Sequence, residues 1–398
     1  MSSVEFVSSK SVVKHSLVVL LVPLVALSVV TQLYLLLPVV DIMNHFLGTK
    51  SSLTGLLTSA FGGFYAVGFL VWGFLSDKFG RVKIIVSGLF ALAAVTALIA
   101  FQSDFHSILA LRCIQGFIAS SFPPVVLAWV AENFQERLKK FLISLLSCSF
   151  LLAGTLGQLY GSLMVNESLE KAMLLLCIMY CVGAICFSMW ADKGKKTQIP
   201  GKKNHAGLAL KTLLSTLSDR SLSRIYLASL FVLMSFVSFY YITLSHIRTD
   251  ALANIDINIL RNTATLGMMA CLFSGFIFQH IQPAKLLSIM LLVIAITVPV
   301  QYAMSIAEGS WFFPAVIVHF IFSCAVSLAV PAMIYCVALF SDQTNRGVAV
   351  SLYTCILFIG ASLGSLIPAV IKPVYFIALL TSGFLLASFS VAKKVSHK

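Results

Sequence analysis

The chain has 398 residues, of which 59% are hydrophobic and 10% are charged, and its mean hydropathy is +0.99. A soluble domain is nearer half apolar and about a quarter charged, so a water-soluble core could not hide this much apolar surface. Long continuous apolar runs favour membrane-spanning helices over a barrel, whose strands give short alternating segments. The formal net charge of +13 indicates orientation against a membrane, and no nucleic-acid partner is expected.

Apolar runs of roughly 20 residues, the length that crosses a hydrocarbon core of about 30 Å, predict twelve transmembrane helices. The predicted spans are 16–40, 53–75, 83–102, 107–131, 141–164, 172–190, 224–246, 262–281, 286–306, 312–339, 347–370 and 374–391. The first run lacks a small-residue cleavage site and precedes many more spans, so we expect a retained helix and not a signal peptide. The predicted fold class is an all-α, multi-pass membrane protein.

Basic residues predict the orientation of the chain. With a cytoplasmic N-terminus, most of the 27 Lys and Arg residues fall in cytoplasmic segments, which places both termini in the cytoplasm. The longest polar segment, 191–223, is rich in lysine and follows the sixth span, so we expect a basic cytoplasmic linker. It divides the chain into a six-helix bundle over 1–190 and another over 224–398. Two such pseudo-repeats with a cavity between them are typical of transporters.

The loop between the second and third spans concentrates charge in a chain that has little. Residues 73–83 read Gly-Phe-Leu-Ser-Asp-Lys-Phe-Gly-Arg-Val-Lys. Gly80 permits a tight turn, and Gly73 allows a neighbouring helix to approach closely. Asp77 can pair with Arg81 or face the positive N-terminal end of another helix. The alternative is that these charges only orient the chain in the membrane.

Arg112 lies inside the fourth predicted span, where a charged side chain is expensive and indicates a functional site. It begins the sequence Arg-Cys-Ile-Gln-Gly, so Gln115 follows it by about one helical turn. Gln32 and Tyr34 of the first span are candidate neighbours. The alternative is a side chain that snorkels to the nearby outer surface.

No Asp or Glu lies deep in any predicted span, so a proton would need another carrier. The candidates are His319 in the tenth span, for which a structural role is the alternative, and Asp41 and Glu132 near helix ends. Tyr240 and Tyr241 could line a cavity. The nine cysteines lack partners for a metal set, and no phosphate-binding or dinucleotide loop occurs, so neither a metal site nor an enzyme is expected.

These features resemble the major facilitator superfamily over essentially the full length of the chain. The resemblance rests on six plus six spans, the long central loop, the Gly-x-Leu-Ser-Asp order of residues 73–77 with Gly80 and Arg81, and the Arg-x-x-Gln-Gly order of residues 112–116. It implies the major facilitator fold, and the chain is most similar to twelve-helix drug–proton antiporters. The fifth span lacks the proline of an antiporter motif, which weakens the case for export.

The residues and the resemblance together predict two groups of site residues. The first is a cytoplasmic conformational latch beside the start of the eleventh helix. It contains Gly73, Asp77, Gly80, Arg81, Glu132 and Arg137. The second is a substrate and proton pathway. It contains Arg112, Gln115, Gln32, Tyr34, His319, Tyr240 and Tyr241.

The expected function is secondary active transport by alternating access, with proton-driven export of a small organic compound such as a drug or a siderophore. The alternative is proton-coupled import of a small nutrient such as a sugar, an amino acid or an organic acid; a non-transporting membrane sensor is a third possibility. We expect a monomer in the lipid bilayer of the inner (plasma) membrane, without a cofactor and driven by the proton gradient. The sequence leaves the substrate and the direction open.

Overall fold

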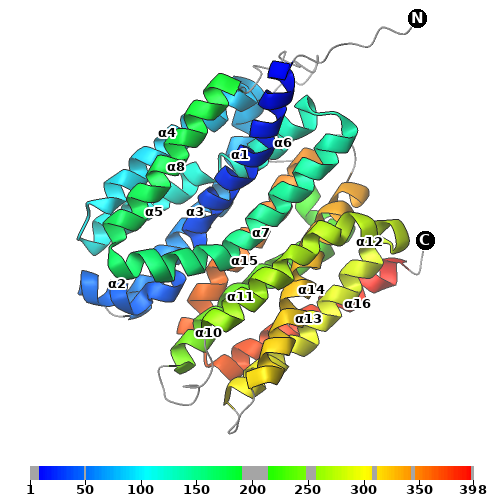
Figure 1. Cartoon of the computed structure of the whole chain (residues 1–398). Helices are drawn as coiled ribbons and strands as arrows, with labels where there is room; N and C mark the ends of the chain where they lie inside the picture. Colours follow the sequence, from blue (N-terminus) through cyan, green and yellow to red (C-terminus); the bar gives the residue numbers. More distant parts are fainter. Residues whose placement is uncertain are drawn as a thin grey trace, which may run out of the picture.

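A computed structural model describes residues 9–48, 51–190, 214–247, 257–306, 312–341 and 346–395. Within these ranges the chain is a bundle of long helices without a strand (Figure 1). The all-α fold predicted from the apolar runs is therefore confirmed. Residues 191–213, most of the predicted basic linker, lie outside the described part of the chain.

The helices of the first half follow the predicted spans with short additions. They are α1 (Ser9–Tyr34), η1 (Leu37–Val39), α2 (Val40–Leu47), α3 (Ser51–Phe79), α4 (Arg81–Ala100), α5 (Phe105–Ala119), α6 (Pro123–Asn133), α7 (Glu136–Glu167) and α8 (Leu169–Trp190). The fourth predicted span is divided into α5 and α6, and α6 begins at Pro123, where a proline fits the first turn of a helix.

The second half is built in the same way. Its elements are α10 (Arg220–Ile247), α11 (Ile257–Met268), η2 (Met269–Phe273), α12 (Ser274–His280), α13 (Pro283–Ile306), α14 (Phe312–Phe340), α15 (Arg346–Leu366), η3 (Ile367–Ala369) and α16 (Pro373–Val395). In Figure 1 this half, coloured yellow-green to red, lies beside the blue-to-green first half.

Among the described residues, eleven helical stretches are long and apolar enough to cross a membrane. The remaining predicted span, 262–281, is present as the divided segment α11, η2 and α12. This segment also starts earlier than predicted, at Ile257, and its first helix carries Asn258, Arg261 and Asn262. In the described part of the chain, the twelve predicted spans are thus present as eleven apolar stretches and one segment that is polar at its start and broken in the middle.

The two halves repeat one close helix crossing. In the first half α7 packs against α1, and in the second half α15 packs against α10. A Cβ atom on Gly161 of α7 would overlap the backbone carbonyl oxygen of Leu35, and a Cβ atom on Gly360 of α15 would overlap that of Leu230. Small residues of this kind let two membrane helices approach to backbone contact.

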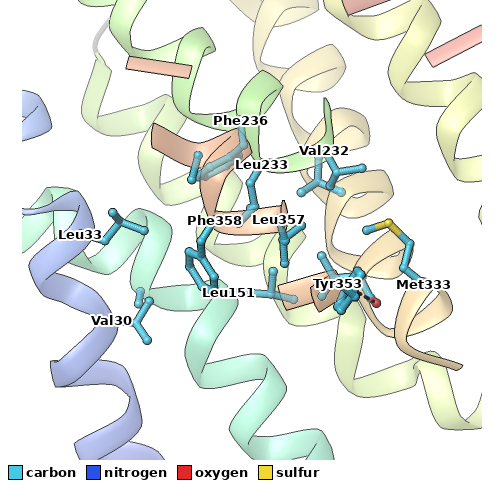
Figure 2. Packing of buried hydrophobic residues seen from close by; sticks show 14 of the residues in the cluster. Val30, Leu33, Leu151, Val232, Leu233, Phe236, Met333, Tyr353, Leu357 and Phe358 are labelled. Carbon is cyan, nitrogen blue, oxygen red and sulfur yellow. Dashed lines mark hydrogen bonds between the residues drawn. The ribbon is translucent and has the colours of Figure 1, made fainter. Parts of the chain in front are cut away.

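The halves meet along two seams, α3 against α15 and α7 against α11. Between the seams, buried apolar side chains from both halves belong to one continuous cluster. Figure 2 shows Val30 and Leu33 of α1 and Leu151 of α7 in the same cluster as Phe236 of α10 and Phe358 of α15. The centre of the bundle is therefore packed and apolar.

Candidate functional site

The position of Arg112 is set by helix α5, whose first turn is fixed by a side-chain cap. The N-cap of α5 is Asp104, whose carboxylate accepts a hydrogen bond from the backbone N–H of Ser107 at 2.8 Å. This bond from the Ser107 backbone lowers the pKa of the Asp104 carboxyl, because it stabilises the charged form. Starting from this cap, Arg112 falls two turns into α5 on its buried face, and its side chain is 0% exposed.

The guanidinium of Arg112 ties together several helices of the first half. Its Nη1 donates to Gln115 Oε1 at 2.7 Å and to Gln32 Oε1 at 3.3 Å, and its Nη2 donates to the backbone carbonyl of Gln32 at 2.8 Å. Its Nε donates to the carbonyl of Leu57 on α3 at 3.3 Å. The network extends to α4 because Gln115 Nε2 donates to Thr96 Oγ1 at 2.8 Å. Arg112 thus joins α1, α3 and α5 directly and α4 through Gln115.

The charge of Arg112 is balanced without a carboxylate. Its carbonyl partner Gln32 is among the last residues of α1, where backbone carbonyls have no partner within the helix and the helix dipole is negative. The guanidinium carbon also lies 4.3 Å from the ring centroid of Phe61, a cation–π contact. Because these interactions stabilise the charge of Arg112, the first span can carry the neutral Gln32 where an acidic residue might be expected. Tyr34, the last residue of α1, is buried beside Gly157 of α7.

A second buried polar cluster lies in the other half, around His319 of α14. Gln301 Nε2 donates to the carbonyl of Thr297, which turns its Oε1 toward His319 Nδ1 at 2.8 Å. Because this oxygen can only accept, Nδ1 carries the proton, and Nε2 accepts from the hydroxyl of Tyr240 at 3.0 Å. The imidazole also stacks on Phe239 with ring centroids 4.4 Å apart.

The His319 cluster joins three helices, α10, α13 and α14. Gln301, which sequence reasoning did not single out, completes it, while Tyr241 is partly exposed on α10 beside Tyr240. A proton on Nε2 could be accommodated if the Tyr240 hydroxyl turned to accept it, because a hydroxyl both donates and accepts. Both ring nitrogens of His319 can therefore keep a hydrogen-bond partner whether the ring is neutral or protonated.

The residues expected to form a latch are only partly described. Gly80 has φ +97° between α3 and α4, a conformation that favours glycine, and Arg81 begins α4. Arg81 Nη2 lies 3.1 Å from Glu132 Oε1 of α6, and its Nη1 donates to Ser76 Oγ. Gly73 faces Ser351 of α15. The side chains of Asp77 and Arg137 lie outside the described part of the chain.

The seam between α7 and α11 carries contacts that the sequence did not indicate. The hydroxyls of Thr155 and Thr265 are hydrogen-bonded at 2.9 Å, and the thiols of Cys148 and Cys271 lie close to each other across the same seam. Arg261, which directly precedes the predicted span 262–281, is 2% exposed on α11. It helps to line a cavity of about 410 Å³ between α7 and α11, near Pro38. The earlier start of α11 explains this burial.

The other seam, α3 against α15, is held by neutral groups. Ser59 Oγ lies 3.0 Å from Ser365 Oγ and donates to the carbonyl of Ser362 at 3.3 Å. The ring of Tyr65 contacts that of Phe358 edge-on, with centroids 4.8 Å apart. The Tyr65 hydroxyl is buried and has no hydrogen-bond partner among the described residues. A polar group without a partner therefore lies where the two halves meet.

Two packed helical halves, each with its own buried polar cluster, that meet along two seams are the architecture of a multi-pass membrane transporter. Residues 24–365 match the profile of the Major Facilitator Superfamily, and the chain belongs to this family. The superfamily resemblance expected from residues 73–83 and from the Arg112 motif is thereby confirmed.

The chain is similar to several known transporters. A probable triacylglyceride transporter of Mycobacterium bovis is 31% identical over 131 residues, which cover 31% of this chain and 25% of that protein. The chloramphenicol resistance protein CraA of Acinetobacter baumannii is 34% identical over 94 residues, which cover 24% of this chain and 23% of that protein. The chain thus matches about a quarter of the length of these relatives.

Among solved structures, the human organic anion transporter MFSD10 has a similar fold. Its TM-score is 0.68 at 18% sequence identity, and the match covers 94% of this chain and 97% of that one. The similarity therefore extends over both halves of the chain and concerns the fold.

Proposed function

We propose that this protein is a secondary active transporter of the inner (plasma) membrane that exports a small organic compound in exchange for protons. The compound would be a drug or an endogenous metabolite such as a siderophore. Transport would proceed by alternating access, with the two halves rocking about the packed centre and with both chain termini in the cytoplasm.

The observation that carries this proposal is the contrast between the interior of each half and the seams between them. Within the first half, the buried Arg112 donates hydrogen bonds to acceptors on three helices. Across the seams the polar contacts pair neutral hydroxyls, such as Ser59 with Ser365 and Thr155 with Thr265. A neutral hydrogen bond contributes only about 0.5–1.5 kcal/mol net. Halves that stay rigid while their seams open are what a rocking transporter requires.

A substrate would enter the space that opens at the centre. The Tyr65 hydroxyl, which lacks a partner in the closed arrangement, would then gain one from the substrate or from water. The apolar side chains around it, such as Leu33, Phe236 and Phe358, suit a largely apolar compound. The local similarity to a chloramphenicol resistance protein supports export of such compounds.

Proton coupling would use His319, because no Asp or Glu is buried among the described residues. Its ring is hydrogen-bonded to Tyr240 of α10 and Gln301 of α13. Protonation of the ring would therefore change a hydrogen bond to each of these two helices. Arg112 would keep the first half rigid through its hydrogen bonds to α1 and α3.

Everted membrane vesicles test the proposal. When respiration acidifies their interior, an exporter coupled to protons accumulates chloramphenicol inside, and dissipation of the gradient by an uncoupler releases it. Vesicles that accumulate no compound from a panel of drugs and siderophores would contradict export. Gradient-dependent loss of a sugar, amino acid or organic acid from the vesicles would instead support an importer.

A further inference from the structure

We propose that a small cavity inside the second half binds a water molecule that carries protons to His319 from the end of the bundle where α10 and α13 end. The cavity lies between α10, α13 and α16. The inference rests on the proposed function, because His319 is the proton carrier in both. The access of water to His319 can nevertheless be tested without transport.

The cavity has room for one water molecule and polar groups to bind it. Its volume is about 20 Å³, and one water molecule needs about 10–15 Å³ and about two to four polar partners. The polar residues of its lining include Ser235, Ser238, Thr243, Gln301 and Ser305. An apolar cavity of this size would stay dry, whereas this one is suited to water.

The polar side chains at the deep end of the cavity present acceptors. Ser235 Oγ donates to the carbonyl of Val232 at 2.8 Å, and Ser238 Oγ donates to the carbonyl of Ser235 at 3.1 Å. Gln301 Nε2 likewise donates to the carbonyl of Thr297 at 3.2 Å. Because both hydroxyl protons are used within the helix, the lone pairs of these oxygens remain for a guest that donates. Water is such a guest, and water that carries an extra proton is a stronger donor.

Two residues of the cavity wall also contact His319. Gln301 Oε1 lies 2.8 Å from His319 Nδ1, and the ring of Phe239 stacks on the imidazole with centroids 4.4 Å apart. His319 itself is 0% exposed, so a proton that arrives through the cavity must pass this wall. A turn of the Gln301 amide would let the water molecule take its place at Nδ1.

One end of the cavity is more exposed than the other. Ser238 and Gln301 are buried, whereas Tyr302 and Ser305 are partly exposed. Ser305 is next to the last residue of α13, and Thr243 lies in the last part of α10. In the predicted orientation this is the outer end of the bundle, from which a proton-driven exporter takes its protons.

The two ring nitrogens of His319 would exchange protons on different sides. When the ring carries its proton on Nε2, a hydronium ion in the cavity gives a proton to the lone pair of Nδ1, which leaves neutral water and an imidazolium. The imidazolium then gives its Nε2 proton to water admitted beside Tyr240 when the seams open. This leaves the neutral ring with its proton on Nδ1, the form that donates to Gln301 in this structure.

The surrounding groups leave His319 as the acceptor of such a proton. Among the described residues, α14 and the elements packed on it (α10, α11, η2, α12, α13 and α15) carry no Asp or Glu. Their other buried ionisable side chains are Tyr226, Tyr240, Arg261, Cys271, Cys336, Tyr353 and Cys355. Tyrosine, cysteine and arginine side chains already hold their protons near neutral pH, so histidine is the one that can gain a proton there.

The test is hydrogen–deuterium exchange at the Cε1 carbon of histidine, measured by mass spectrometry on the full-length protein in detergent and heavy water. This exchange requires a protonated ring and water or hydroxide that reaches it. We expect His319 to exchange although it is buried. Ser238→Val fills the deep end of the cavity with methyl groups and should slow exchange at His319 about fivefold or more. The exposed His106 should exchange at an unchanged rate and serves as the internal control.

Ser382→Val is the matched control variant. Ser382 is an exposed residue of α16 whose hydroxyl also donates to a carbonyl of its own helix, and it lies outside the cavity lining. Its replacement should leave exchange at His319 unchanged. Ser305→Leu provides a second route should Ser238→Val fail to fold, since Ser305 is partly exposed and a larger side chain there would block the mouth of the cavity. We expect it to slow exchange at His319 as well.

No exchange at His319 in the unmodified protein would overturn the proposal, as would exchange that the folded Ser238→Val or Ser305→Leu variants leave unchanged. These outcomes are separate from those for transport. Exchange at His319 that depends on the cavity, in a protein that moves no compound, would support the water route and contradict only the proposed function. Proton-driven transport by a protein whose His319 exchanges independently of the cavity would contradict this route alone.

Discussion

Nη2 of Arg112 donates a hydrogen bond to the backbone carbonyl oxygen of Gln32, 2.8 Å away, where α1 approaches its last residue. The contact pairs a buried cation with the negative end of a helix, and it does so without an acidic side chain. It explains how a charged residue can persist in the interior of a membrane protein. It also makes Arg112 a residue on which the packing of several helices depends.

Arg112→Gln should therefore destabilise the protein as well as reduce transport. Loss of the guanidinium leaves the buried acceptors of Gln32, Gln115 and Leu57 without donors, at about 1–3 kcal/mol for each unsatisfied group. We expect a clearly lower thermal unfolding midpoint in detergent and little flux. Arg220→Gln, which removes an exposed arginine at the start of α10, is the matched control. An unchanged midpoint in Arg112→Gln would refute this role.

The ion pair of Arg81 and Glu132 should affect the rate of transport more than the stability of the fold. The two side chains are 20% and 48% exposed, so solvent screens the pair and its coupling should be about 1 kcal/mol or less. Arg81→Gln and Glu132→Gln, alone and combined, form a double-mutant cycle measured by unfolding and by flux. We expect altered flux with nearly unchanged unfolding. Flux equal to that of the unmodified protein in all three variants would exclude a latch at this pair.

Cys148 and Cys271 are two native thiols, one in each half, that can be tested as a crosslinking pair. Their thiols lie close to each other where η2, which follows α11, packs against α7. Oxidation by copper–phenanthroline takes two electrons from the two thiols, releases their protons and leaves a disulfide. We expect flux to stop on oxidation and to recover with dithiothreitol, since the seam can no longer open.

The crosslink is detected with a protease site inserted between residues 190 and 224. After oxidation and cleavage, the two halves should migrate together on a non-reducing gel and separately once reduced. Cys148→Ser is the control and should give separate halves under both conditions. Separation of the halves in the oxidised unmodified protein would show that the seam thiols cannot be joined.

His319→Asn should uncouple transport of the compound from the proton gradient. Asparagine can hydrogen-bond to neighbours such as Gln301 and Tyr240 but cannot take up a proton near neutral pH. We expect downhill flux to remain while gradient-driven accumulation falls about tenfold or more, the equivalent of about 1.4 kcal/mol. Tyr240→Phe removes the group that would accept the second ring proton and should show a weaker form of the same defect. Full gradient-driven accumulation in His319→Asn would assign proton coupling elsewhere.

The spans and the family could be predicted because they depend on local sequence. A run of about 20 apolar residues is enough to predict a membrane helix, and residues 73–83 and 112–116 carry short motifs. The neighbours of Arg112 could also be predicted, since Gln115 lies one turn away and Gln32 is one of the few polar residues in the first apolar run. The hydrogen bond from Arg112 to the end of α1 could not be predicted, because hydropathy does not show that this helix ends at Tyr34.

The seams between the halves were not predictable from the sequence. Thr155 and Thr265 are 110 residues apart, and nothing local to either residue indicates the other. Arg261 was placed outside the membrane because the apolar run begins after it, whereas α11 begins four residues before it. Gln301 and His319 meet because α13 and α14 pack together, a tertiary contact that periodicity alone does not specify.

The most direct test of the account is proton movement in proteoliposomes that hold the purified protein and a trapped pH-sensitive dye. The account predicts that a gradient of a transported compound such as chloramphenicol drives protons in the opposite direction, and that the dye records this movement. In His319→Asn, the dye signal should be abolished while flux of the compound continues. Flux of the compound with no dye response in the unmodified protein, or no flux of any compound from the panel, would contradict proton-driven export.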